Sequence, residues 1–286
     1  MSIKLIQDKL NSYNCQSEFE EEHAIREITQ EVVLAALGRT DFFKQAVFQG
    51  GTCLRIFYGL NRFSEDLDFI LREPDRSFTF EPYLSALSDE LNAYGYNIDI
   101  TDRSKAETNV RKAFIKDDSI GKVLQVKHVG KTGPFRKIRI KFEVDTNPPS
   151  GSDQQISYLD FPFVSSVTTQ DLPSLFAGKI HALLCREYTK GRDWYDFIWY
   201  AGRETGINYA FLASALKQQG PWQGKELNVD KKWCIDAMRE KICSLNWQES
   251  KDDIRRFVRQ NELASIELWD QELFLDRLEK HASKIE

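Results

Sequence analysis

The chain has 286 residues, of which 41% are hydrophobic and 12% aromatic, so it can build a packed core and is not globally disordered. Its 39 basic and 44 acidic residues give a net charge of −5, which excludes a uniformly basic nucleic-acid binder. No apolar run approaches the roughly 18 residues of a membrane span, and the five scattered cysteines predict neither a disulfide framework nor a zinc site. We therefore expect a cytoplasmic protein without membrane contact.

The N-terminal half mixes helical and extended patterns. A helix is predicted over residues 17–38, where an acidic first turn precedes apolar residues at helical spacing. A short helix is predicted at 53–60, directly after Gly50-Gly51-Thr52, and another over 80–95. Apolar or alternating runs predict strands at 46–50, 66–71, 96–101, 112–129, 136–146 and 155–166.

Helical patterns dominate after Asp171-Leu172-Pro173, which has the acidic cap and early proline of a helix start. The predicted helices are 172–189, 193–203, 208–218, 231–245, 250–262 and 268–284. We therefore predict an α+β fold, with a mixed sheet flanked by helices in a domain over residues 1–168 and an all-helical domain over 169–286.

Two aspartates stand two positions apart at the start of the predicted strand 66–71. Alternate strand residues share a face, so Asp66 and Asp68 should project side by side while Leu67 and Phe69 turn into the core. Adjacent carboxylates repel each other unless a cation lies between them, and their oxygens suit Mg²⁺. Taken alone, an Asp-x-Asp pattern is also typical of a solvated strand face.

A glycine pair precedes these aspartates. Gly50, Gly51 and Thr52 stand where a helix is predicted to start, so backbone N–H groups can approach a phosphate closely and the helix dipole favours an anion. This segment is a candidate site for a triphosphate.

A second acid-bearing strand is predicted over 136–146, where apolar and charged residues alternate from Arg139 to Asp145. If this strand neighbours that of Asp66 and Asp68, Glu143 becomes a third carboxylate. Three acids around two Mg²⁺ ions would make a two-metal site for nucleotidyl or phosphoryl transfer. Without such a neighbour, the pattern is more typical of a solvent-exposed edge strand.

These motifs resemble those of the nucleotidyltransferase-like AbiEii toxins, which belong to the polymerase-β-type nucleotidyltransferase superfamily. The stretch FQGGTCLRIFYGLNRFSEDLDFIL is similar to the first motif of this family, and the strand with Lys141 and Glu143 is similar to the second. The resemblance covers residues 20–205. The first-motif positions are Gly50, Gly51, Thr52, Arg62, Ser64, Asp66, Asp68 and Phe69.

The helical stretch LFAGKIHALLCREYTKGRDWYDFIWY resembles the last motifs of the family. On the predicted helix 172–189, Lys179 and Arg186 share a face and would hold the β- and γ-phosphates, or else extend into solvent. Asp193 and Asp196 lie three positions apart on the next predicted helix. Their carboxylates would fix Lys179 or Arg186, touch the nucleotide, or cap the helix.

The resemblance implies an Mg²⁺-dependent nucleotidyltransferase with an NTP substrate, acting as the toxin of a toxin–antitoxin pair, with a cognate antitoxin and tRNA as an acceptor. Asp66, Asp68 and Glu143 would be the catalytic and metal-binding residues. The nucleotide would be bound by Gly50, Gly51, Thr52, Lys179, Arg186 and Asp193.

Two alternatives remain open: a GTP- or other NTP-binding toxin that acts through a partner without transfer, and a kinase or AMP-transferase that modifies protein. A basic stretch at 121–142 would suit an RNA backbone but also suits a solvated hairpin. Its seven cations are Lys122, Lys127, Lys131, Arg136, Lys137, Arg139 and Lys141.

Overall fold

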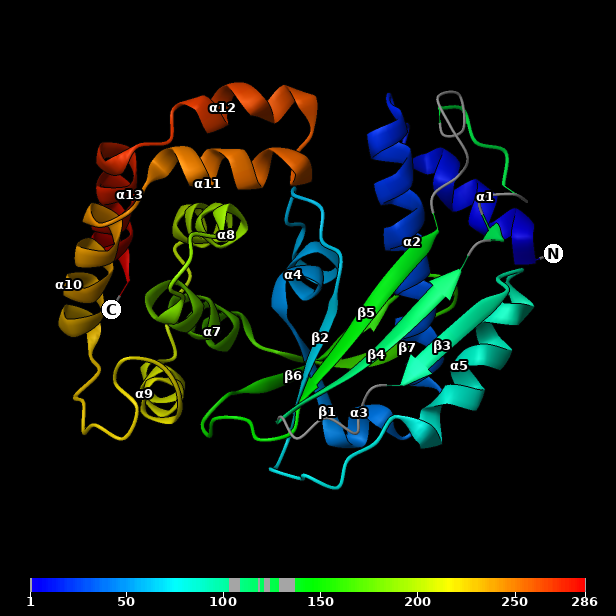
Figure 1. The fold of residues 1–286 in the computed structure, drawn as a ribbon, viewed down its shortest axis with the longest axis horizontal. Helices are drawn as coiled ribbons and strands as arrows, with labels where there is room; N and C mark the ends of the chain where they lie inside the picture. The colour runs from blue at the N-terminus through cyan, green and yellow to red at the C-terminus, as the bar shows by residue number, and fades with distance from the viewer. Residues whose placement is uncertain (1, 103–108, 118, 121–123, 129–136, 286) are drawn as a thin grey trace. The chain divides into compact units, whose positions relative to one another are not determined.

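The computed structural model describes residues 2–102, 109–117, 119–120, 124–128 and 137–285 (Figure 1). The chain divides into two compact units, which are described separately. Unit 1 comprises Met1–Gly59, Phe63–Pro148 and Gln155–Thr169, and unit 2 comprises Leu60–Arg62, Pro149–Gln154 and Gln170–Glu286. The predicted domains 1–168 and 169–286 stay a prediction, because compactness alone does not make a segment an independently folding domain.

A mixed sheet forms the centre of unit 1. In the part of the chain that the structure describes, it has seven strands in the order β3-β4-β5-β2-β1-β7-β6. β2 pairs parallel with β5 and antiparallel with β1, while β1 pairs parallel with β7. The strands are β1 (Ala46–Gln49), β2 (Leu67–Leu71), β3 (Ile98–Asp102), β4 (Val110–Asp117), β5 (Ile138–Asp145), β6 (Gln154–Leu159) and β7 (Ser165–Gln170).

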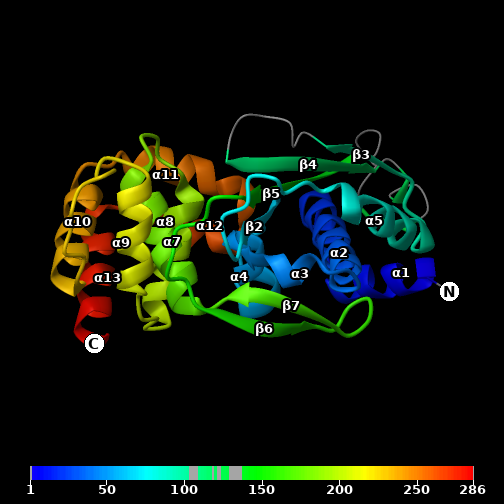
Figure 2. The ribbon, with the colours of Figure 1, turned by 90° about the horizontal axis from the view of Figure 1, so that it is seen from below.

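The longest helix of unit 1 is α2, which begins where the Ser17 hydroxyl accepts a hydrogen bond from the Glu20 amide. Figure 2 shows β3, β4 and β5 on one side of α2 and β6 and β7 on the other. The core between helix and sheet is aromatic, with Phe69 of β2 lying 4.9 Å from Phe42 and 5.1 Å from Phe48 between ring centroids. The helices are α1 (Ser2–Ser12), α2 (Glu18–Gly38), α3 (Phe42–Gln45), α4 (Gly50–Tyr58) and α5 (Glu81–Ala93).

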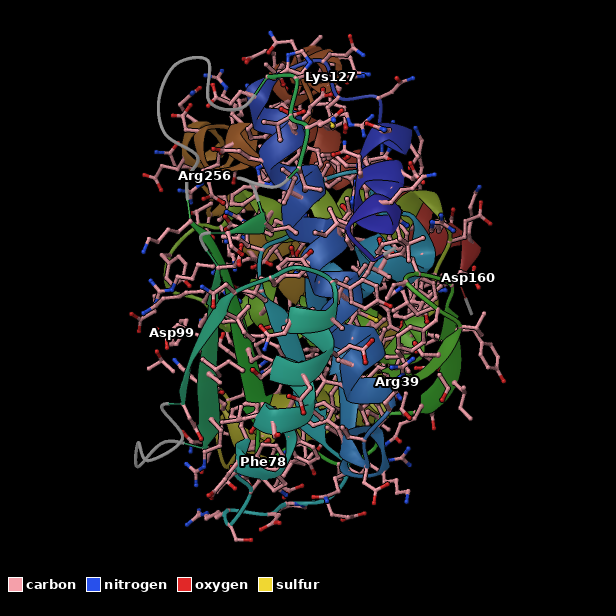
Figure 3. All side chains as sticks on the ribbon, turned by 90° about the vertical axis from the view of Figure 1, so that its right-hand side faces the viewer. Arg39, Phe78, Asp99, Lys127, Asp160 and Arg256 are labelled. Carbon is pink, nitrogen blue, oxygen red and sulfur yellow. The ribbon has the colours of Figure 1, made fainter. Side chains whose placement is uncertain are left out.

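Two predicted strands in unit 1 are longer than the strands that the structure shows. The strand predicted over 112–129 ends at Asp117, and residues 124–128 lie outside the strands. Their backbone amides donate instead to side chains of the N-terminal helices: those of Lys127 and His128 to the Glu21 carboxylate, and that of Gln125 to Gln7 (Figure 3 labels Lys127). Residues 130–134, which lie between the predicted strands 112–129 and 136–146, are outside the described residues.

The strand predicted over 155–166 is two strands, β6 and β7, which flank a segment containing Pro162. Proline has no amide hydrogen to donate to a sheet ladder, so it favours an interruption there. A single continuous strand was therefore the wrong interpretation of this stretch.

Unit 2 is helical, and most of its helices begin after an aspartate or asparagine whose side chain accepts a backbone amide. Its core is also aromatic: the Phe176 and Tyr200 rings stack at 4.3 Å, and those of Trp247 and Phe274 at 4.1 Å. The helices are α7 (Leu172–Cys185), α8 (Gly191–Gly202), α9 (Tyr209–Gln218), α10 (Lys231–Cys243), α11 (Trp247–Ile254), α12 (Leu263–Glu267) and α13 (Gln271–Lys284), with 3-10 turns Arg255–Phe257 and Gln260–Glu262.

The predicted helix 172–189 is too long. α7 ends at Cys185, and Arg186 has extended backbone torsions, with φ −75° and ψ 133°. Its carbonyl oxygen accepts a hydrogen bond of 2.9 Å from Lys241 Nζ of α10 rather than continuing the helix. The helix prediction is therefore wrong at Arg186, which lies just beyond the end of α7, although Lys179 and Arg186 both reach the Asp193 carboxylate.

The predicted helix 250–262 is likewise too long, because α11 ends at Ile254 and Val258 is extended. The predicted fold class is nevertheless confirmed: a mixed sheet with flanking helices is followed by a helical C-terminal region. Among the described residues, none of the helices combines the length and apolar character needed to span a membrane.

Candidate active site

The two aspartates of β2 lie on the polar face of their strand. Leu67 and Phe69 are fully buried on the other face, whereas Asp66, just before β2, and Asp68, within it, are half-buried. This is the predicted alternation of strand side chains. Both carboxylates are thus held at β2 and remain accessible to solvent.

Glu143 of β5 lies directly beside Asp68. In the parallel pairing of β2 with β5, Asp68 is in register with Glu143, and in the antiparallel pairing of β2 with β1 it is in register with Gln49. In-register residues on neighbouring strands point to the same face, so Glu143 shares the face of the aspartates. The edge-strand interpretation of residues 139–145 is wrong, since β5 lies between β4 and β2.

Two lysines surround the Glu143 carboxylate. Lys141 Nζ lies 2.6 Å from one of its oxygens, and Lys112 Nζ lies 3.2 Å from the other. Burial by itself would lower the pKa of Lys141, but its hydrogen bond to Glu143 and the charges of Glu143, Asp66 and Asp68 outweigh burial and raise that pKa. Lys141 is therefore a fixed cation among all three acids. The sequence signal for this role of Lys141 was its position in the second family motif, two residues before Glu143.

The donor set fits a magnesium ion that is shared with substrate. Mg²⁺ usually takes one or two carboxylates and completes its shell with water and phosphate oxygens, and Asp66 and Asp68 supply two half-buried carboxylates on one face. Within the residues described, no three His, Cys, Asp or Glu side chains form a group that could hold a metal by themselves. The metal roles of Asp66, Asp68 and Glu143 stay a prediction.

Gly50 is packed against Asp68 at the start of α4. Its φ of +80° is left-handed, and a Cβ atom built there would lie 2.7 Å from Asp68 Oδ2. The helix begins at Gly50, three residues earlier than predicted, so its first backbone amides have no partner within the helix. These amides are beside Asp68 and suit a phosphate group.

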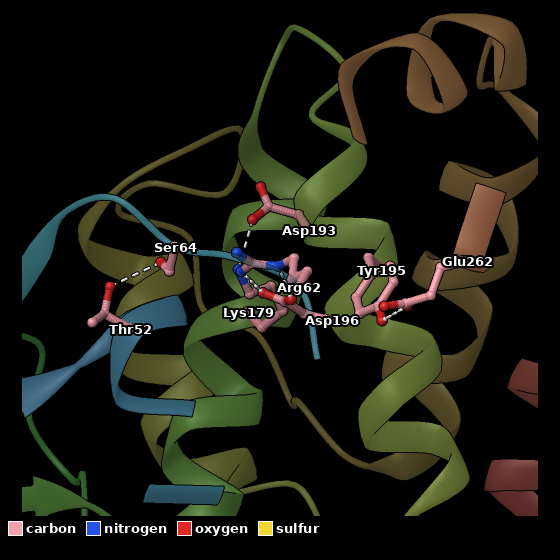
Figure 4. Close-up of polar contacts among 8 residues, drawn as sticks. All are labelled: Thr52, Arg62, Ser64, Lys179, Asp193, Tyr195, Asp196 and Glu262. Atoms are coloured by element: carbon pink, nitrogen blue, oxygen red, sulfur yellow. Dashed lines mark hydrogen bonds and ion pairs between the residues drawn. The ribbon is translucent and has the colours of Figure 1, made fainter. Parts of the chain in front are cut away.

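Thr52 connects α4 to the loop that carries the aspartates. Its fully buried hydroxyl lies 2.5 Å from the carbonyl oxygen of Asp66 and 2.8 Å from Ser64 Oγ (Figure 4). The Thr52 side chain thus holds the backbone of Asp66 in place. The sequence motifs did not predict this role of Thr52. A contact of Thr52 with nucleotide stays a prediction, and it would be made through the backbone amide.

A buried ion cluster joins the helical motifs within unit 2. Arg62 forms two hydrogen bonds with Asp196, at 2.6 and 2.7 Å, and Lys179 Nζ lies 2.6 Å from Asp193 and 2.8 Å from Asp196 (Figure 4). Arg186 reaches Asp193 at 3.2 Å. Of the roles left open for the two aspartates, the structure shows that they fix Lys179.

The charges of this cluster stabilise one another. Burial alone would raise the pKa of both aspartates, but Lys179 and Arg186 lower that of Asp193 to about 2, and Arg62 and Lys179 lower that of Asp196. The same contacts raise the pKa of Arg62 and Lys179, so these two cations and both aspartates are ionised at neutral pH. Contacts of Lys179, Arg186 and Asp193 with a nucleotide stay a prediction.

The family model described as nucleotidyl transferase AbiEii toxin, type IV TA system, matches residues 32–277. The chain belongs to this family. The AbiEii chain is thus a nucleotidyltransferase and a toxin of a toxin–antitoxin system, and its family implies an antitoxin partner. The resemblance drawn from the sequence motifs is confirmed.

Solved structures share the fold of this AbiEii chain. MenT4, a nucleotidyltransferase toxin from Mycobacterium tuberculosis, aligns with a TM-score of 0.60 at 15% identity, over 98% of this chain and 89% of that one. JHP933 from Helicobacter pylori aligns with a TM-score of 0.54 at 19% identity, over 92% and 91% of the two chains. A putative nucleotidyltransferase from H. pylori aligns with a TM-score of 0.52 at 17% identity, over 90% and 92%. No curated protein sequence matches the chain.

Replacing Gly50 with alanine is expected to lower both stability and nucleotidyl transfer. The left-handed φ costs a non-glycine residue about 1–2 kcal/mol, and the added methyl group would displace the Asp68 carboxylate. Gly59→Ala is the matched control, since Gly59 has a φ of +74° with nothing within 4 Å of its Cβ position. Thermal unfolding should show similar losses for both variants, whereas transfer should fall only in Gly50→Ala. Equal loss of transfer in both would contradict this role of Gly50.

Proposed function

We propose that this AbiEii toxin is an Mg²⁺-dependent nucleotidyltransferase that moves a nucleotide from an NTP to the 3′ end of an RNA such as tRNA. The observation that carries the proposal is the row of residues across three strands, in which Gln49, Asp68 and Glu143 are in register. This row places Gly50 on one side of Asp68 and Glu143 on the other. The segment proposed to bind phosphate and the carboxylate proposed to activate the hydroxyl are thus both adjacent to the aspartates.

In the proposed reaction, an acceptor hydroxyl oxygen forms a bond to the α-phosphorus while the bond to the β-phosphate oxygen breaks and pyrophosphate leaves. Asp66 and Asp68 would hold the magnesium complex of the triphosphate, and the first amides of α4 would bind its phosphates. Bound Mg²⁺ would neutralise charge on the triphosphate and favour deprotonation of the hydroxyl. The Glu143 carboxylate would accept the hydroxyl proton, with Lys112 and Lys141 holding it in place.

The test is to incubate the full chain with each α-labelled NTP, Mg²⁺ and total tRNA, and then to separate RNA, protein and free nucleotide. We expect label on RNA, and loss of that label when the divalent ion is chelated. Label on polypeptide would support a protein-modifying enzyme instead. Nucleotide binding without any labelled product would support a toxin that acts through its partner. Either outcome would overturn the proposal of RNA as acceptor.

A further inference from the structure

A cavity of about 460 Å³ opens beside Asp66 in unit 1. Its size falls within the range of about 300–1,000 Å³ that is typical of small-ligand sites, which is enough for a nucleotide but not for a duplex. Three of its six lining residues are cations, and one is aromatic. The lining residues are Arg26, Glu65, Asp66, Phe114, Arg139 and Lys141.

The sheet order separates this cavity from the glycine segment. Gly50 follows β1, which pairs with one edge of β2. Arg139 and Lys141 belong to β5, which pairs with the other edge of β2, and Phe114 belongs to β4, the next strand after β5. The aspartates of β2 therefore lie between the phosphate-binding segment and the cavity. In an in-line displacement the leaving group and the attacking hydroxyl lie on opposite sides of the phosphorus. If pyrophosphate leaves toward Gly50, the hydroxyl arrives from the cavity.

The cavity wall has the chemistry of a stacking platform. The Arg139 guanidinium carbon lies 4.3 Å from the centroid of the Phe114 ring, and Phe114 is in register with Lys141 across the β4–β5 pair. Arg139 is exposed while Phe114 is buried, so the guanidinium covers the ring and its other side faces solvent. Unpaired bases stack on aromatic rings and on guanidinium planes in this way, without regard to sequence.

A second arginine, from helix α2, also lines the cavity. Arg26 of α2 donates to Glu65 at 2.6 Å through Nη1, while its buried Nε makes no hydrogen bond to any residue within the described ranges. Buried donors in native proteins usually have a partner, so this N–H can donate a hydrogen bond to a phosphate or base oxygen of a ligand. Arg26, Arg139 and Lys141 thus give the cavity three cations against the two acids Glu65 and Asp66, a positive balance that suits a nucleic-acid backbone.

We propose that this cavity binds the unpaired 3′-terminal nucleotides of the RNA acceptor, with a base stacked on Arg139 over Phe114 and the terminal hydroxyl directed at Asp66 and Glu143. The proposal rests on the proposed function, since it names the acceptor site of the same reaction. Stacking needs an exposed base face, so the acceptor end must be single-stranded.

The test uses the full chain with Mg²⁺, labelled NTP and synthetic RNA hairpins that end either in a three-nucleotide 3′ overhang or bluntly. We expect the overhang RNA to be the better acceptor. Arg139→Ala should raise the KM for this RNA about tenfold or more, because the stacking surface is lost, with the KM for NTP unchanged. Arg139→Lys should raise the KM for this RNA nearly as much, because lysine keeps the positive charge but lacks the planar guanidinium on which a base can stack.

Arg39→Ala is the matched control. The Arg39 guanidinium also lies over a phenylalanine, 3.7 Å from the Phe163 ring centroid, and its side chain is 55% exposed, but it is not part of the cavity (Figure 3 labels Arg39). Its KM values should match those of the parent chain. Fluorescence anisotropy of the overhang RNA without NTP gives a second readout, in which Arg139→Ala should weaken binding to a similar extent.

The outcomes separate the two proposals. If the parent chain labels no RNA, the proposed function fails. If it labels RNA but Arg139→Ala leaves the RNA KM and RNA binding unchanged, the acceptor site alone is wrong. If Arg139→Ala raises the KM for NTP instead, the cavity holds the base of the NTP, which also overturns the acceptor site.

Discussion

Replacing Asp68 with asparagine is expected to lower the rate of nucleotidyl transfer about 1,000-fold without unfolding the protein. Asparagine keeps the shape of the side chain and removes its charge, so the magnesium–triphosphate complex loses one of its two proposed carboxylates. A 1,000-fold loss corresponds to about 4 kcal/mol of transition-state stabilisation, a magnitude reached when one group that stabilises developing charge is removed. The measurement is the initial rate of label transfer at saturating NTP.

Asp99→Asn is the matched control for this variant. It makes the same chemical change at an exposed position of β3, at the edge of the same sheet, away from β2 (Figure 3 labels Asp99). Its transfer rate and Tm should equal those of the parent chain, and the Tm of Asp68→Asn should change little as well. Transfer by Asp68→Asn at the parental rate would show that the carboxylate pair is not the catalytic centre.

Replacing Asp196 with alanine is expected to destabilise the protein by about 3–5 kcal/mol, the usual cost of leaving one charge of a buried pair without its partner. Arg62 is 3% exposed and Asp196 is fully buried, and their two charge-assisted hydrogen bonds join residues 134 positions apart in the chain. The variant would leave Arg62 uncompensated and would remove one of the two carboxylates that hold Lys179. Urea unfolding followed by tryptophan fluorescence reports the loss, since Trp194 lies in the core of the same helical unit.

The control for Asp196→Ala removes an exposed aspartate that, like Asp196, contacts a lysine within unit 2. Asp276→Ala removes the partner of Lys280 on α13, where both side chains are exposed, so the expected loss is at most about 1 kcal/mol. A double variant that replaces Arg62 with methionine and Asp196 with leucine should recover part of the stability, because no unpaired charge remains. Equal losses for Asp196→Ala and Asp276→Ala would contradict the structural role of the Arg62–Asp196 pair.

Local sequence patterns predicted most elements of the fold because they depend on near neighbours. The period of the apolar residues located α2 and β2, and the alternation around Leu67 determined that the two aspartates share the solvent-facing side of a strand. The failures occurred where distant groups satisfy the backbone. Residues 124–128 look like a strand in sequence, but the amides of Gln125 and Lys127 donate to side chains of the N-terminal helices, 118 and 106 positions earlier in the chain.

Motifs and residue patterns are enough to identify the family, the fold class and the side of β2 on which Asp66 and Asp68 lie. The three-dimensional packing was needed to show that Glu143 is in register with Asp68, that Lys141 interacts with all three acids, and that Arg62 pairs with Asp196. Strand register depends on side-chain packing across the whole sheet, because a slip of one residue would turn Glu143 to the opposite face. A buried ion pair likewise forms only when folding brings two remote segments together, so no local pattern can encode it.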